Sequence, residues 1–182
     1  MKTKKQENLI TPEKVDIYKI SDSLEYRRAL ARNDIEAIKN LAKVHFVKHN
    51  VVPKTGREQL GKILTKHCSW QASDDDAETW INYCAIGTSD TAHTENSTKL
   101  HSESFRKLVA SGSYSSNIFK TTSHYLPDDC DGSFREEEVV IEGTDVADSG
   151  VAFSIISLSS AEGNKSDSEA LLIERTFTIS IS

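Results

Sequence analysis

The second half of the chain alternates short apolar stretches with polar turns, and this pattern restricts the fold more than any other feature of the sequence. The clearest stretch runs from Trp80 to Ile86, and the one that begins at Val151 alternates apolar side chains with polar or small ones. Six stretches are predicted to be strands: 80–86, 105–109, 118–126, 133–142, 151–159 and 170–182. Short strands separated by polar turns predict an antiparallel β-sandwich of jelly-roll-like form.

The first quarter of the chain has a pattern typical of helices. Pro12 after Thr11 suits the first position of a helix, and residues 22–32 are good helix formers. Asp34 is a suitable N-cap for a further helix over residues 35–48, where apolar side chains recur at helical spacing. We therefore expect a helical docking segment in front of the β-sandwich.

Charge divides the chain in the same way. Residues 1–50 hold 11 Lys+Arg and 7 Asp+Glu, and the remaining residues hold 11 and 21, so a net charge of +4 precedes a net charge of -10. An acidic body argues against nucleic acid as a partner, because phosphate binding needs a basic face. We predict two units: a basic N-terminal arm with helices at 1–67, and an acidic antiparallel β-sandwich at 68–182.

Cysteine spacing and hydropathy exclude several classes of protein. Cys68, Cys84 and Cys130 are widely spaced and form no CxxC pair, so we expect free thiols and neither a zinc cluster nor a disulfide framework. No apolar run approaches the roughly 20 residues that span a membrane, and the first ten residues lack the apolar core of a secretion signal. We expect a chain made in a cytoplasm, with no membrane partner.

Several short motifs follow one another in a fixed order after residue 49. They are Asn50-Val51-Val52, Gly56-Arg57, Ala85-Ile86-Gly87-Thr88, Leu100 with Glu103 and Arg106, the strand 134–141, the stretch 149–153 and the closing stretch 176–180. In this order they resemble a family of bacteriophage tail and baseplate-associated structural proteins. The resemblance does not reach residues 1–49. One departure is the run Glu136-Glu137-Glu138, where the family has a single Glu followed by small or apolar residues.

The resemblance implies a structural, non-enzymatic role in a phage virion. It implies a β-sandwich that is repeated around a symmetric particle and binds other virion proteins and copies of itself. The helical segment would dock it on the tail, baseplate or neck, or carry a fibre. Sheet edges suit such a role, because an edge strand can pair with a strand of a neighbouring chain. The chain would be made in the host cytoplasm and end in the virion.

Four residues are candidates for structural or interface roles: Trp80, Gly87, Glu103 and Arg106. Trp80 is expected in the core, and Gly87 ends the first strand. Glu103 and Arg106 lie three apart, so strand alternation puts them on opposite faces; either both are exposed, or one turns inward to pair with a loop backbone or a neighbouring chain. The run 136–138 is expected to be solvated, with a contact to the basic arm of another subunit as the alternative.

No residue pattern predicts a catalytic, cofactor or metal site. His45 and His49 would share a helix face, but the residue after His45 is not the Glu that the HExxH motif needs. A calcium loop that began at Asp128 would need Glu at its twelfth position, where Val139 stands. Cys84 lies inside an apolar strand, where a thiol is inert. We predict that the chain is not an enzyme and needs no cofactor.

An alternative function is a host-receptor or carbohydrate-binding module of a phage fibre. Such sites favour exposed aromatic side chains on loops, and the long loop 87–99 has none of Phe, Trp or Tyr. Trp70, Trp80 and Tyr114 are the remaining candidates. Outside this alternative, no small-molecule ligand is expected.

Overall fold

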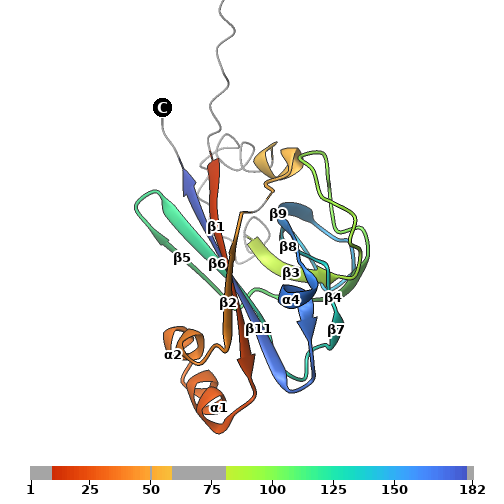
Figure 1. The fold of residues 1–182 in the computed structure, drawn as a ribbon. Coiled ribbons are helices and arrows are strands. Elements are labelled where there is room, and N and C mark those ends of the chain that lie inside the picture. The colour runs from red at the N-terminus through yellow and green to blue at the C-terminus, as the bar shows by residue number, and fades with distance from the viewer. Residues whose placement is uncertain (1–9, 50, 59–80, 180–182) are drawn as a thin grey trace, which may run out of the picture.

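The chain is mainly β, with antiparallel sheets and few helices, in a computed structural model that describes residues 10–49, 51–58 and 81–179 (Figure 1). The predicted antiparallel β class is thereby confirmed. The elements are β1 Ile10–Ser21, α1 Leu24–Ala31, α2 Ile35–Asn40, β2 Val44–Lys48, β3 Ile81–Gly87, β4 Glu103–Leu108, β5 Ser111–Ser115, β6 Ile118–Tyr125, β7 Gly132–Ser133, β8 Glu136–Ile141, β9 Val151–Ser157, α4 Ser160–Gly163, β10 Asn164–Lys165 and β11 Glu169–Ile179.

The larger sheet has five strands in the order β2-β1-β11-β6-β5. Its longest pairing joins β1 to β11, from Ile10 opposite Ile179 to Ser21 opposite Glu169. The helix predicted to begin at Pro12 is therefore wrong. Proline lacks the backbone N–H that a regular ladder uses, and the β1–β11 register shifts next to it, between Pro12 and Lys14.

The two predicted helices are only partly correct. Residues 24–31 form α1, and Asp34 caps α2 as predicted, since its side chain accepts a hydrogen bond from the Ala37 N–H at 3.0 Å. The helix over 35–48 is wrong in its second half, because α2 ends at Asn40 and β2 pairs with β1. The residues of β2 are β-branched or aromatic at Val44, Phe46 and Val47, which suits a strand better than a helix.

The second sheet has four strands in the order β4-β3-β8-β9, and it faces the first across a common core (Figure 1). The core includes Val15, Ile17, Leu171, Ile173 and Phe177 of the larger sheet with Cys84, Ile86, Val139, Ile141 and Phe153 of the smaller one. A separate cluster buries Tyr26, Ala29 and Ile38 of the helices against Ile20 and Leu172, on the other face of the larger sheet.

The predicted boundary between residues 67 and 68 lies outside the described residues, and the two-unit division stays a prediction. Both β1 and β2, from the first predicted unit, nevertheless share a sheet with β6 and β11 from the second. Among the described residues, no helix is long and apolar enough to cross a membrane.

Candidate functional site

Three consecutive glutamates in β8 are buried, which contradicts the prediction that they are solvated. Glu136, Glu137 and Glu138 are between 0% and 1% exposed. The reason is the position of β8, which lies between β3 and β9 and has both faces covered. Because alternate residues of a strand face opposite ways, Glu137 points toward the larger sheet, and Glu136 and Glu138 point to the outer face of the smaller one.

Glu137 joins the two sheets through Arg175 of β11. Their side chains form an ion pair, and the Arg175 Nη1 donates to Glu137 Oε1 at 3.1 Å. The hydroxyls of Ser123 and Tyr125 donate to the same oxygen at 2.8 and 3.3 Å. The Arg175 Nε donates to the Ser154 hydroxyl at 3.1 Å. A buried ion pair that is hydrogen-bonded on several sides fixes the relative position of the elements that carry it.

Glu136 holds the loop of residues 88–102 against the outer face of the smaller sheet. It accepts hydrogen bonds from the backbone N–H groups of His101 and Ser102 at 2.9 and 2.7 Å, and it lies 2.7 Å from His93 Nε2. Burial lowers the pKa of His93, although Glu136 acts to raise it. The rings of His93 and His101 stack with their centroids 4.5 Å apart. The loop is therefore fixed by a carboxylate at its base.

Gly87, one of the predicted structural residues, lies where Glu136 crosses the end of β3. A Cβ at Gly87 would collide with the Ser102 carbonyl oxygen and would lie 2.5 Å from Glu136 Oε1. Leu100 anchors the same loop, because it is buried against Ala85 and Ala152. Trp80, the fourth predicted candidate, lies outside the described residues.

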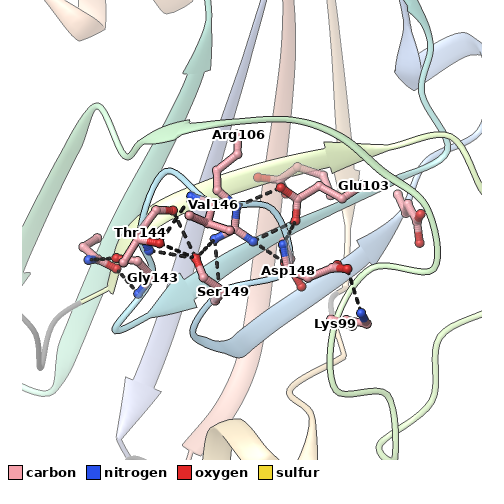
Figure 2. Close-up of polar contacts among 12 residues, drawn as sticks. Lys99, Glu103, Arg106, Gly143, Thr144, Val146, Asp148 and Ser149 are labelled. Atoms are coloured by element: carbon pink, nitrogen blue, oxygen red, sulfur yellow. Dashed lines mark hydrogen bonds and ion pairs between the residues drawn. The ribbon is translucent and has the colours of Figure 1, made fainter.

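Glu103 and Arg106 form a buried ion pair, which differs from the prediction that they lie on opposite faces. The Arg106 Nε and Nη2 donate to the two carboxylate oxygens of Glu103 at 2.8 and 2.7 Å (Figure 2). The register of β3 and β4 shifts between Ile86 and Gly87, so that Ser104 is an extra residue in β4. An extra residue of this kind reverses the alternation of faces and brings the two side chains together.

This pair also holds the loop of residues 143–150. The Arg106 Nη1 donates to the Ser149 carbonyl at 3.0 Å, and the Asp148 N–H donates to Glu103 Oε2 at 3.0 Å (Figure 2). An exposed ion pair of 2.7 Å between Lys99 and Asp148 then links this loop to loop 88–102. Both side chains therefore turn inward and contact a loop backbone, whereas the prediction had both exposed or only one of them turned inward.

Glu138 lies behind the pair, with its Oε1 3.6 Å from Arg106 Nη2. Burial raises the pKa of Glu138 to about 8; Arg106 opposes this rise, while Glu103, Asp148 and Glu136 add to it. Its Oε2 is buried without a hydrogen-bond partner. Burial alone would lower the pKa of Arg106, but the hydrogen bonds and charge of Glu103 and the charge of Glu138 raise it. Arg106 is therefore a permanent cation beside a carboxyl whose pKa is raised to about 8.

The other residues weighed for chemistry have structural surroundings. Cys84 is a free, buried cysteine, and burial raises the pKa of its thiol. His45 lies in β2, 2.7 Å from Asp16 and stacked on Tyr18, so the predicted helix face with His49 does not exist. Within residues 10–49, 51–58 and 81–179, no group of three or more His, Cys, Asp or Glu could hold a metal ion.

A hollow of about 440 Å³ opens on loop 88–102, lined by Ala92, Thr94 and residues 96–101. Apart from Ala92 and Leu100, its lining carries hydroxyl, amide, amino and imidazole groups. The geometry of the whole face is thus two loops, 88–102 and 143–150, fixed on a sheet by buried carboxylates. We call this surface the loop platform.

Sequence reasoning missed Arg175 and the roles of the three glutamates. A usable signal was present, because Arg175 is an isolated cation in a strand that is otherwise largely apolar, and such a residue needs a buried acid.

Comparisons of the chain with protein-family models, with curated proteins and with solved structures found no match.

Proposed function

We propose that the chain is a non-enzymatic structural component of a bacteriophage virion, in the tail, baseplate, neck or fibre attachment. Its two facing sheets would be a β-sandwich module of jelly-roll-like form that acts through repeated protein–protein interfaces. Its partners would be other virion proteins and copies of itself. The ordered motifs from Asn50 to Ser180 support the family, and the surface of the fold supports the mode of action.

One observation carries this proposal: large apolar side chains are exposed on strands that end the sheets. Val47 of β2 is 55% exposed, Leu108 of β4 is 59% exposed and Tyr114 of β5 is 88% exposed. Each of these strands lies at the end of its sheet. An edge strand offers unpaired backbone groups, and exposed apolar side chains beside it favour association with another chain.

The loop platform adds a second kind of surface. Its loops are tied to the sheet by hydrogen bonds with the buried side chains of Glu103, Arg106 and Glu136. A surface that is already ordered loses less conformational entropy on binding. The buried charged groups at its base hold backbone in place, which suits a scaffold that presents the same surface in every copy.

Two measurements on purified particles test the proposal: their protein composition and a density map of the intact particle. Mass spectrometry of virions from the organism that encodes the chain should find it at a fixed ratio to the other structural proteins. A map of the intact particle should then contain the two facing sheets at symmetry-related positions. If the chain is made during infection but is absent from purified particles, the proposal is wrong.

The alternative, a receptor-binding or carbohydrate-binding module, is favoured by the hollow on loop 88–102, which is lined by three hydroxyl groups and the side-chain amide of Asn96. Neighbouring hydroxyl and amide groups suit hydrogen bonds to a sugar. A glycan array probed with the wild-type chain and with Asn96→Ala tests it, with Ser115→Ala on β5 as the control. Binding that only Asn96→Ala removes would support this alternative, and the absence of binding by the wild-type chain would exclude glycan recognition.

A further inference from the structure

We propose that two copies of the chain pair edge to edge through β5, antiparallel and about a twofold axis at Ser113. This inference deepens the proposed function by naming one partner, and it rests on that function only for its setting in a virion. The five-stranded sheet of one copy would continue into that of the other.

The strand β5 is an open edge without the usual protection. Natural edge strands are commonly blunted by charged residues, proline or bulges. The sequence of β5, Ser111–Ser115, contains no charged residue and no proline, and its register with β6 has no shift. In Figure 1 it lies at the margin of the larger sheet, away from the smaller sheet.

Each of the other edges carries at least one feature that limits regular strand-to-strand pairing along its whole length. The edge β4 has a bulge at Ser104 and carries Arg106 and Lys107. The edge β9 is covered at its centre, because Val51 and Ile155 exchange backbone hydrogen bonds of 2.9 and 3.0 Å. The edge β2 carries His45 and Lys48. Among the edges of the two larger sheets in the described residues, β5 is the one that lacks all of these features.

The hairpin fixes which backbone groups of β5 face outward. Ser115 pairs with Ile118 across a two-residue turn, and Ser116 has the positive φ, 57°, that the first position of such turns requires. The residues that flank a two-residue turn form a hydrogen-bonded pair, and bonded and non-bonded pairs then alternate. Ser111, Ser113 and Ser115 therefore bond to β6, and the N–H and C=O groups of Gly112 and Tyr114 point to the open edge.

Two residues of β5 have no explanation within one copy. Gly112 does not have a positive φ, and a Cβ there would approach nothing closer than the Lys120 carbonyl oxygen at 3.8 Å. The strand thus has room for a side chain but has none. Tyr114, two residues later on the same face, is 88% exposed. A glycine inside a strand often marks the place where another chain comes close.

Antiparallel pairing about Ser113 accounts for both residues at once. It sets Gly112 of each copy opposite Tyr114 of the other, and Ser111 opposite Ser115. The Tyr114 ring then covers the open space above Gly112 of the second copy, a cross-strand arrangement known to compensate for strand glycines. The outward N–H and C=O groups of the two residues form the hydrogen bonds of the new ladder.

Charge is compatible with this pairing. In a twofold pair, the central residue meets its own copy, so a charged residue there would meet a like charge. Ser113 is neutral, as are its neighbours in β5. The nearest cation opposite it in β6, Lys120, is already paired with Glu174 at 3.1 Å.

Disulfide trapping tests the register. In a Cys68→Ser, Cys130→Ser background, Ser113→Cys places two thiols in a non-hydrogen-bonded pair, with Cα atoms about 4.5 Å apart, within the range that a disulfide spans. We expect a covalent dimer linked through position 113 under mild oxidation. Ser111→Cys and Ser115→Cys alone should stay monomeric, and a mixture of the two should form a cross-linked heterodimer. The register is overturned if the Ser113→Cys chain stays monomeric. It is also overturned if Ser111→Cys or Ser115→Cys alone forms a covalent dimer as readily as Ser113→Cys.

Sedimentation of the wild-type chain tests the pairing without added cysteines. We expect a monomer–dimer equilibrium, and we expect Tyr114→Ser to raise the dissociation constant about tenfold or more. Leu24→Ser, which removes a 59% exposed apolar side chain from helix α1, should leave the equilibrium unchanged. Because Tyr114 is exposed, the melting temperature of the variant at high dilution should match that of the wild type.

The two proposals fail in different ways. A wild-type chain that sediments as a monomer at every concentration overturns the pairing through β5, whether or not the chain is found in virions. A chain that dimerises through β5 but is absent from purified particles retains the pairing and loses the virion role.

Discussion

Arg175 of β11 and Glu137 of β8 form an ion pair between the two sheets, and both side chains are 0% exposed. Burial lowers the pKa of Arg175 to about 10, so that it remains a cation at neutral pH. Desolvation of two charges costs much of the energy that their attraction returns. The pair therefore contributes more to the relative position of the sheets than to their stability.

A double-mutant cycle at this pair should show that each single substitution lowers the free energy of unfolding more than the double substitution does. Arg175→Met or Glu137→Leu alone leaves one buried charge without a partner, and we expect either to lower the free energy of unfolding by about 3–5 kcal/mol. The double variant leaves no unpaired charge, so its loss should be smaller than either. Urea denaturation measures the three values. A double variant whose loss equals the sum of the single losses would show that the two side chains contribute independently, which contradicts their pairing.

Breaking the buried pair of Glu103 and Arg106 should lower the free energy of unfolding far more than breaking the exposed pair of Lys99 and Asp148. We expect Arg106→Ala to lower the free energy of unfolding by about 3–5 kcal/mol, because Glu103 stays buried without its partner. It should also speed hydrogen exchange at the Asp148 amide, which donates to Glu103. The matched control is Lys99→Ala, which breaks the Lys99–Asp148 pair at half-exposed positions and should cost at most about 1 kcal/mol. Equal losses in the two variants contradict the structural role of Arg106.

Glu138 should make the stability of the fold depend on pH. Its pKa is about 8 in the folded chain against an ordinary 4.5. Between these values the folded state keeps a proton that the unfolded state has lost, so Glu138 lowers stability as the pH rises, by up to about 1.4 kcal/mol per pH unit. Glu138→Gln is uncharged at every pH, so its free energy of unfolding relative to the wild type should rise from pH 4.5 to 8 and then level off. Thermal melts across this range measure the difference, and parallel curves for the two chains contradict the raised pKa.

The regular strands of the second half could be predicted because their apolar and polar residues alternate and no helix signal competes with this pattern. The stretches predicted at 118–126, 151–159 and 170–182 correspond to β6, β9 and β11, with bounds that differ by a few residues at most. The strands β1 and β2 were missed for the opposite reason. Thr11-Pro12 and the apolar spacing after Ile35 are helix signals, and only the long-range pairing of β1 with β11 makes that segment extended.

The charged site was harder to predict, because it depends on contacts between distant segments. The prediction that Glu103 and Arg106 lie on opposite faces assumes regular alternation along the strand. The bulge at Ser104 breaks this alternation, and it arises from the pairing of β4 with β3. The prediction that residues 136–138 are solvated rests on their charge alone. Its burial depends on β8 being an interior strand, with an arginine on one side and two loops on the other.

Two glycines should respond in opposite ways to the same substitution. At Gly87 an added methyl group meets the Ser102 carbonyl oxygen, which accepts a hydrogen bond from the Thr88 N–H, and the Glu136 carboxylate, which accepts one from the Ser102 N–H. We expect Gly87→Ala to lower the free energy of unfolding by about 1–3 kcal/mol, since backbone must move to make room. At Gly112 the methyl group enters open space, so Gly112→Ala at high dilution should leave stability unchanged or raise it by up to about 1 kcal/mol, because it restricts the unfolded chain. Urea melts of both variants measure this, and the amide exchange of Ser102 reports whether the loop has moved. A Gly87→Ala chain as stable as the wild type, with the Ser102 amide still protected, would show that Glu136 does not pass as close to β3 as the geometry requires.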